Sequence, residues 1–296
     1  MTTLTIRNRI SVAEICFYAP TLLAAVFLAV RHGLGRNAAW VYLGIFSIVR
    51  LSGAALELAT IAHPLNIDIH TAAMIFQNIG ISPLMLVMMG LVGRMLASIR
   101  RGGRRRTAVG PGELRLVQML IFLGLVLVIA GGVKAGNQFK KTLHFQLPVE
   151  GEAGLGLIIS GFGLLTMAAL YVSVLASHIA PGERRLLSAV WVSFPFLIVR
   201  VVYGAMGTYT RNPKFNQLTG SAYYFLGMAV AMEMAVVVVC VAIGATLPPT
   251  PMAEQAAELR KLRDSLRIRT RKVLGREPES SRTPSQENLE KDQPTV

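Results

Sequence analysis

Charged residues are scarce in this chain. Asp, Glu, Lys and Arg make up 16% of its 296 residues, hydrophobic residues make up 53%, and the mean hydropathy is +0.51. Soluble domains carry about 25% charged residues. The deficit is spread over many long apolar runs, so it argues against an ordinary soluble domain and predicts a polytopic membrane protein.

Cysteine is also nearly absent. The only two cysteines, Cys16 and Cys240, lie in different apolar runs, and we expect them at opposite depths of a membrane. A disulfide needs Cα atoms within about 7 Å of each other, so we expect no disulfide between them.

Acidic residues are outnumbered, with 16 Asp and Glu against 30 Lys and Arg, which gives a net charge of +14. The basic residues lie mostly at the ends of apolar runs. This placement fits a membrane surface better than a nucleic acid, and we expect no nucleic-acid partner.

Seven apolar runs are each close to the roughly 20 residues that a helix needs to cross a bilayer. The sequence therefore predicts an all-α, seven-helix transmembrane domain over residues 1–250. The expected helices cover about 11–30, 38–62, 70–97, 113–133, 153–178, 186–209 and 220–247. A long polar loop is expected over about 134–152, and Pro248, Pro249 and Pro251 should end the last helix.

The distribution of Lys and Arg between the loops predicts the orientation. With the N-terminus outside, the cytosolic loops hold most of the basic residues. Those loops contain Arg31, Arg36, Arg100, Arg101, Arg104, Arg105, Arg106, Arg184 and Arg185, and the tail adds more. The positive-inside rule thus favours an outer N-terminus and a cytosolic C-terminus in the plasma membrane or an endomembrane.

The tail after Pro251 changes character. Apolar residues recur at helical spacing within 253–274, and seven basic residues lie between Arg260 and Lys272. We expect a basic amphipathic helix over 251–275 that contacts anionic lipids of the inner leaflet, or else a solvated basic flank. Residues 276–296 are rich in Ser, Pro and Glu and are expected to be disordered.

The segment WVSFPFLIVRVVY, residues 191–203, carries Arg200 near its middle although the rest could lie in lipid. A charge at the bilayer centre costs about 2.5 to 3.5 kcal/mol on insertion scales, so Arg200 should face a partner or an aqueous cavity. Other polar residues are expected at similar depths. The expected polar centre consists of Glu14, Arg50, Glu57, Asn78, Arg200, Tyr203 and Glu233.

Two ion pairs are expected in this centre. The first joins Arg200 to Glu233 on neighbouring helices, and the second joins Arg50 to Glu57 or Glu14. Arg94, near the cytosolic end of its helix, is expected to extend its side chain to the membrane surface. The pairs either fix the packing of the helices or surround a pocket that opens outward and binds a small anionic or amphipathic ligand.

Several short motifs carry a family resemblance, which covers residues 8–247. They are Glu14 with Tyr18-Ala19-Pro20, Arg31-His32-Gly33 with Arg36 and Trp40, Arg50 with Gly53-Ala54, Ser82-Pro83-Leu84, Arg200 with Tyr203, and Glu233. The pattern resembles a family of fungal seven-helix integral membrane proteins catalogued only as a domain of unknown function. The resemblance implies a fungal membrane protein and brings no established activity.

Two enzyme classes fit this pattern less well. A metal-dependent hydrolase would need three or four ligands, and His63, Asp68 and His70 are weak candidates, with His144 and Glu57 as further ones. Their spacing is not that of helical ligands, and the last helix has no histidine. A terpene-cyclase-like enzyme would use an acid such as Glu57 or Glu233 as proton donor, but nearby arginines should keep those acids ionised.

Other seven-helix classes lack their signatures. The last helix has no lysine for a retinal Schiff base and no Asn-Pro-x-x-Tyr motif, and Arg94 does not stand in an Asp/Glu-Arg-Tyr context. No internal repeat supports a transporter. We therefore expect a receptor-like or lipid- and small-molecule-handling protein without a cofactor, with a membrane-embedded enzyme as the alternative.

Overall fold

The structure is a computed structural model, and it describes residues 5–33, 38–101, 110–142, 148–179, 181–210, 215, 220–247 and 263–264. The chain divides into two units, Met1–Thr250 and Pro251–Val296. Only Arg263 and Asp264 of the second unit are described, both in helical conformation. The amphipathic helix expected over 251–275 and the tail 276–296 otherwise lie outside the described residues.

The described part of the first unit is all-α. Its α-helices are α1 (Ile6–His32), α2 (Ala38–Ala62), α3 (Ile67–Ile79), α4 (Ile81–Arg101), α5 (Pro111–Thr142), α6 (Val149–Val174), α7 (Arg184–Tyr209), α8 (Ala222–Phe225) and α9 (Ala231–Thr246). Two short 3₁₀ turns, Ala176–His178 and Pro181–Glu183, join α6 to α7. Seven candidate membrane spans result, because α3 with α4 and α8 with α9 each form one span.

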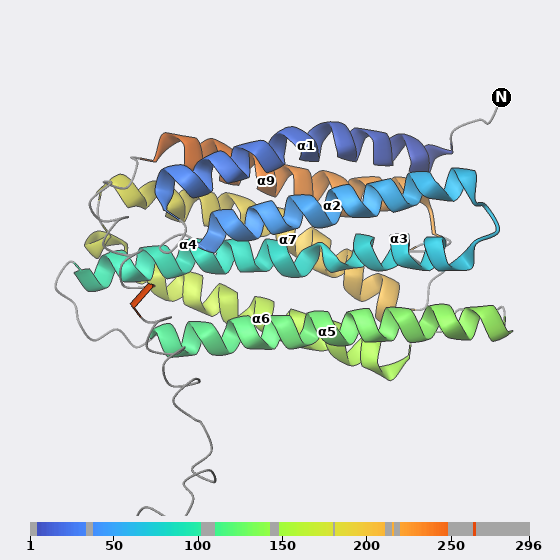
Figure 1. Cartoon of the computed structure of the whole chain (residues 1–296). Helices are drawn as coiled ribbons and strands as arrows, with labels where there is room; N and C mark the ends of the chain where they lie inside the picture. Colours follow the sequence, from blue (N-terminus) through green and yellow to red (C-terminus); the bar gives the residue numbers. More distant parts are fainter. Residues whose placement is uncertain are drawn as a thin grey trace, which may run out of the picture. The chain divides into compact units, whose positions relative to one another are not determined.

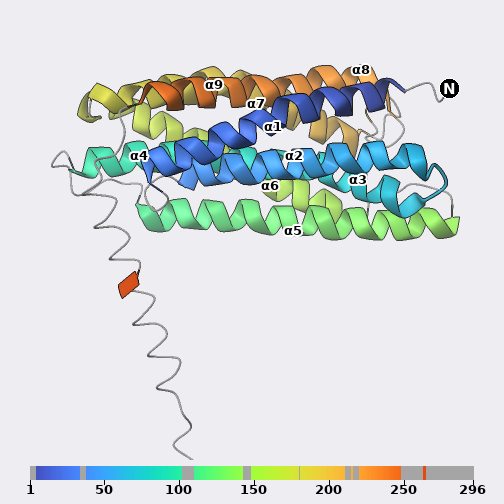
Figure 2. The ribbon, with the colours of Figure 1, turned by 45° about the horizontal axis from the view of Figure 1, so that its top comes forward.

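The helices run side by side along a common direction (Figures 1 and 2). Helix α4 packs against α2, α5, α6 and α7. In the span formed by α3 and α4, 83% of the most apolar stretch is buried, against 22 to 50% in the other spans. This span is therefore the centre of the bundle, while the other helices expose apolar side chains in the way expected of a protein surrounded by lipid.

Helices α3 and α4 are separated by a break at Gly80, next to the buried charges. Pro83 lacks the backbone N–H that would donate to the Ile79 carbonyl, so the regular helical ladder is interrupted there. A Cβ atom on Gly80 would lie 2.7 Å from Nη2 of Arg50, so a side chain there would displace the guanidinium. The glycine thus gives the Arg50 guanidinium its place against the backbone of the central span.

A π-helical turn, Leu226–Val230, joins α8 to α9 and lies three residues before Glu233. Such turns insert an extra residue into the helical register and are frequent at functional sites. The Glu233 carboxyl group that follows is fully buried in the bundle.

Helix α5 extends further than the sequence predicts. It continues to Thr142, into a region expected to be a polar loop from residue 134. Its ion pairs with neighbouring helices contribute: Lys134 pairs with Glu150 of α6, and Lys140 pairs with Asp68 of α3. Small residues let α5 and α6 approach closely, since a Cβ on Gly154 would lie 2.7 Å from the Gly124 carbonyl oxygen.

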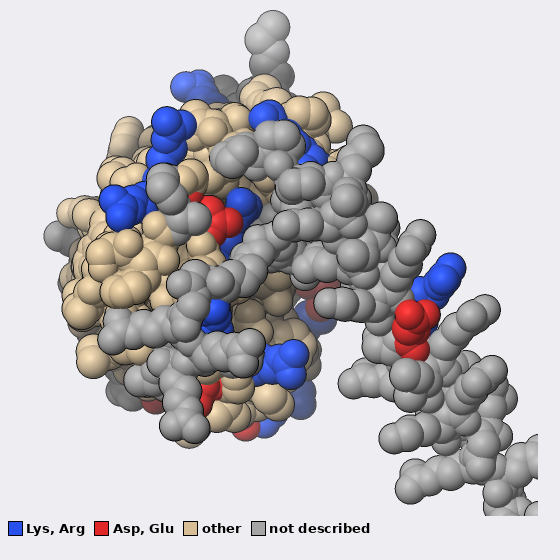
Figure 3. All heavy atoms as spheres, turned by 90° about the vertical axis from the view of Figure 1, so that its left-hand side faces the viewer, with Lys and Arg blue, Asp and Glu red and all other residues tan. Residues whose placement is uncertain are grey.

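Basic side chains are prominent at the end of the first unit where α1, α4 and α9 end and α5 and α7 begin (Figure 3). The exposed or half-buried arginines at these helix ends are Arg31, Arg100, Arg115, Arg184 and Arg185. This is the end that the sequence assigns to the cytosol.

Candidate functional site

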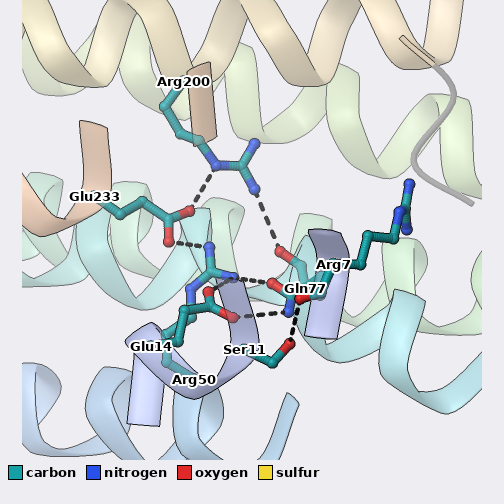
Figure 4. Close-up of polar contacts among 7 residues, drawn as sticks. All are labelled: Arg7, Ser11, Glu14, Arg50, Gln77, Arg200 and Glu233. Carbon is teal, nitrogen blue, oxygen red and sulfur yellow. Dashed lines mark hydrogen bonds and ion pairs between the residues drawn. The ribbon is translucent and has the colours of Figure 1, made fainter. Parts of the chain in front are cut away.

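Four charges of alternating sign form a buried network at the centre of the bundle (Figure 4). Arg200 of α7 donates from Nε to Oε1 of Glu233 at 2.6 Å. The other oxygen of Glu233 accepts from Nη2 of Arg50 of α2. Nη1 of Arg50 lies 3.7 Å from Oε1 of Glu14 of α1. All four side chains are at most 3% exposed, so the charges compensate one another away from solvent.

Gln77 of α3 connects the network to the central span. Its Oε1 accepts from Nη1 of Arg50 at 2.5 Å, and its Nε2 donates to Oε2 of Glu14 at 3.2 Å. Its backbone carbonyl accepts from Nη2 of Arg200 at 3.4 Å. A single glutamine thus contacts both arginines and one of the acids, which fixes α3 against α1, α2 and α7.

The expected pair Arg200–Glu233 is confirmed by this geometry. For Arg50, the expected alternative partner Glu14 is present at 3.7 Å, but the closer partner is Glu233, which was not expected. Glu57 does not pair with Arg50 in the described residues. Seven residues of helix separate their Cα atoms by about 10 Å, and the two side chains do not bridge that distance.

A cavity of about 1020 Å³ extends from the bundle end where α1 begins to the charge network. Near its mouth it is lined by Leu65, which is 93% exposed, and at its inner end by Gln77 and Arg200. Glu57, Asn78 and Tyr203, expected in the polar centre, line the same cavity. Its apolar wall includes Ile61, Ile67, Met74, Phe139 and Phe225.

The expected polar centre is therefore divided into two sets of residues. Glu14, Arg50 and Glu233 form the buried part of the network and do not line the cavity, whereas Glu57, Asn78 and Tyr203 line the cavity outside the network. Arg200 belongs to both sets.

A smaller pocket of about 70 Å³ adjoins the large cavity. Met74, Asn78 and Arg200 line both. The rest of its wall is mostly apolar or glycine, including Ile81, Leu155, Ile158, Gly132, Gly151 and Gly204. Asn78 and Arg200 are the polar residues at the junction of the two spaces.

The weak metal candidates do not converge. His70 Nε2 lies 3.1 Å from the carbonyl oxygen of Pro64, and Asp68 pairs with Lys140. Across the described part of the chain, no group of three or more His, Cys, Asp and Glu side chains is placed to hold a metal ion. His144 lies outside the described residues.

An ion pair outside the network corrects the expectation for Arg94. Its side chain is only 6% exposed, and its Nε donates to Oε1 of Glu183 at 3.2 Å, so it does not extend to the membrane surface. Glu183 lies in the turn before α7, 89 residues further along the chain. Because this turn folds over the end of α4, the carboxylate reaches Arg94 inside the bundle.

Two further contacts were not expected from the sequence. Gln77 has a central role, and its only sequence signal is a polar pair, Gln77-Asn78, in an otherwise apolar run. Arg7 lies beyond Gln77 as seen from Glu233 (Figure 4), and its Nη2 donates to the Gly220 carbonyl oxygen at 3.3 Å. It also lies 5.9 Å from the ring of Phe225, in a cation–π contact at the cavity wall.

Residues 4–250 match the family described as Domain of unknown function (DUF7702), and the chain belongs to this family. Comparisons with curated proteins and with solved structures found no match. The family description assigns no activity, so a function has to be inferred from the geometry of the cavity and the network.

Proposed function

We propose that this chain is a non-enzymatic, receptor-like or lipid- and small-molecule-handling protein of a fungal plasma membrane or endomembrane, whose ligand occupies the large cavity. The observation that carries the proposal is the position of Arg200, which belongs to the buried charge network and also lines the cavity. Ion pairs that only fix helix packing need no cavity beside them.

The lining of the cavity is suited to a small amphipathic or anionic molecule. Its volume of about 1020 Å³ is at the upper end of the range typical of small-molecule sites. Apolar side chains such as Met74 and Phe139 can pack against a hydrocarbon body, while Asn78, Tyr203 and Arg200 offer hydrogen-bonding groups. Such a combination gives affinity through the apolar contacts and orientation through the few polar ones.

The test is to purify the protein from its membranes in a neutral detergent. Mass spectrometry then identifies and quantifies the small molecule that purifies with it. Met74→Trp fills the cavity wall, and Met119→Trp is the matched control because Met119 is 68% exposed on the outside of α5. We expect the wild type and the control to carry the same molecule, and Met74→Trp to carry much less. Equal occupancy in both variants, or an empty wild-type protein, would overturn the proposal.

The orientation with the N-terminus outside is part of this proposal. It would place the mouth of the cavity on the outer or lumenal side and the exposed arginines of Figure 3 in the cytosol. In sealed microsomes, whose outer face is cytosolic, an impermeant maleimide should label Ser177→Cys directly and Leu65→Cys only after detergent is added. The opposite labelling pattern would reverse the orientation.

The tail supports the same orientation. The basic residues of 253–274 would contact anionic lipids of the inner leaflet, and this part of the proposal rests on the sequence alone. Contact of residues 253–274 with the cytosolic leaflet would then weaken as salt is raised, since surface electrostatic attraction is screened.

One observation favours a second candidate, a membrane-embedded enzyme of the terpene-cyclase kind. Within the described residues, the Glu57 carboxylate has no ion pair or hydrogen bond, and it lines the cavity, so it could donate a proton to a substrate there. Lipid extracts of cells producing the wild type should then contain a product that is absent with Glu57→Gln and present with the control Glu152→Gln. Identical extracts would leave the binding role as the better explanation.

A further inference from the structure

The junction between the large cavity and the smaller pocket holds hydrogen-bond donors without partners among the described residues. Arg200 uses Nε for Glu233 and Nη2 for the Gln77 carbonyl, whereas its Nη1 donates no hydrogen bond within the described residues. The side-chain amide of Asn78, which lines the same junction, has no hydrogen-bond partner there either. A guanidinium nitrogen can only donate, so a ligand atom at Nη1 must be an acceptor.

The charge order of the network favours an acceptor that is also an anion. The sequence of charges Glu14–Arg50–Glu233–Arg200 ends on the cavity side with a positive charge, and Glu233 is shared between the two arginines. Arg200 is therefore only partly compensated. In a low-dielectric surrounding, a negatively charged acceptor at its free edge adds the attraction of an ion pair to the hydrogen bond that a neutral acceptor could also accept.

The position of the other charges places the anion at the inner end. Glu57 lines the cavity and would repel an anion nearby, and Arg7, the other arginine of the cavity wall, already donates to the Gly220 carbonyl and contacts the Phe225 ring. Glu14 and Glu233 are engaged by Arg50 and Gln77. Arg50 is not available as a ligand-binding cation, because its two terminal nitrogens donate to Gln77 and Glu233. Arg200 is thus the arginine of the network that can meet a ligand.

We propose that Arg200 Nη1 and the Asn78 amide form an anion-binding site for a monoanionic amphiphile, whose carboxylate or phosphate lies at the junction and whose apolar body lies along the Met74 and Phe139 wall. This deepens the proposed function and rests on it. It names the ligand class, an acidic lipid-like molecule, in place of small molecules in general.

Gly204 provides a steric test at this site. A Cβ atom there would lie 3.7 Å from Nη1 of Arg200 and 3.7 Å from Leu155, which is ordinary van der Waals contact, so a Cβ can be added without displacing a neighbour. Gly204→Leu would fill the space beside Nη1 where the anion should lie. Gly163→Leu is the matched control, because Gly163 of α6 is exposed and a Cβ atom there would meet no neighbouring atom within 4 Å.

The experiment measures binding of radiolabelled decanoate to the full chain in phosphatidylcholine nanodiscs, with unlabelled competitors of one chain length. We expect decanoate and decyl phosphate to bind about 10- to 100-fold more tightly than decanol and decyltrimethylammonium, because only the anions add an ion pair to the hydrogen bond from Arg200. Gly204→Leu and the isosteric Asn78→Asp should lose that preference. Both variants should still elute from a size-exclusion column as the wild type does, which shows that they are folded. Decanol should bind Asn78→Asp as it binds the wild type.

The outcomes separate this inference from the proposed function. If decanol binds as tightly as decanoate, or if Gly204→Leu keeps the preference of Gly163→Leu, the anion site is overturned and the cavity remains a binding site. If acetate or inorganic phosphate competes as well as decanoate, the site binds small water-soluble anions and the lipid-like ligand class is overturned. If none of the probes binds and Met74→Trp also changes nothing, the proposed function fails as well.

Discussion

Two double substitutions in the charge network, Glu233→Met with Arg200→Met and Glu233→Met with Arg50→Met, should differ strongly in stability. Each removes one acidic and one basic side chain. Glu233 is fully buried and accepts from both arginines, so Glu233→Met leaves Arg50 with Glu14 and removes the acidic partner that Arg200 has in the described residues. Removing one partner of a buried ion pair costs about 3 to 5 kcal/mol, because the remaining charge is left uncompensated. We expect a loss of stability of this size for the single variant.

Adding Arg200→Met to Glu233→Met should restore most of that loss. Arg50 then keeps Glu14 at 3.7 Å and Gln77 at 2.5 Å, and the removed pair is replaced by apolar side chains. Replacing a buried ion pair by apolar residues is often neutral or stabilising. Arg50→Met with Glu233→Met should not recover, because no ion pair joins the remaining Arg200 and Glu14 in the described residues.

The assay is reversible unfolding in mixed micelles with increasing dodecyl sulfate, followed by circular dichroism. The two double variants carry the same net charge, and we expect the Arg200 double variant to be more stable by about 3 kcal/mol. Equal stabilities would refute the reasoning, because they would mean that Glu14 does not compensate Arg50. A charge swap, Arg200→Glu with Glu233→Arg, should also fail to recover stability, since the new arginine would face Arg50.

The remaining predictions concern Gly80 beside the network and two ion pairs towards the two ends of the bundle. Gly80→Ala should destabilise the protein by about 1 to 3 kcal/mol in the same assay, because its Cβ would lie 2.7 Å from Nη2 of Arg50 and would displace the guanidinium; a neutral effect would mean that the two do not meet. Glu183→Gln should cost about 3 kcal/mol, because it leaves the 6% exposed Arg94 without its carboxylate. Glu150→Gln, which removes an exposed pair screened by solvent, should change the stability far less than Glu183→Gln, and equal effects of the two would contradict this view.

The number of spans and one ion pair could be predicted from the sequence because both depend on local information. Hydropathy identifies runs of about 20 apolar residues whatever their neighbours are, and the structure has seven candidate spans among its described residues. Arg200 and Glu233 lie on consecutive spans, which lie next to each other in the bundle. Their depths could be estimated by counting residues from the helix ends.

The partners of Arg50 and Arg94 could not be predicted because they depend on the packing of distant segments. Arg50 reaches Glu233 across 183 residues, and this contact requires α2 to lie close to α9 beside α1. Arg94 reaches Glu183 in a turn whose path over α4 has no signal in the sequence. A periodic pattern shows which side of a helix is polar, but it does not show which other helix lies there.

Packing and ligand binding need not compete for the same residues in this centre. Glu14, Arg50 and Gln77 join three helices by themselves, and of the four charged residues of the network only Arg200 lines the cavity. The double variant Arg200→Met with Glu233→Met should therefore keep the fold and lose the preference for decanoate over decanol. If the charges served packing alone, this variant would keep the preference for decanoate, and if the fold depended on all four charges it would lose stability.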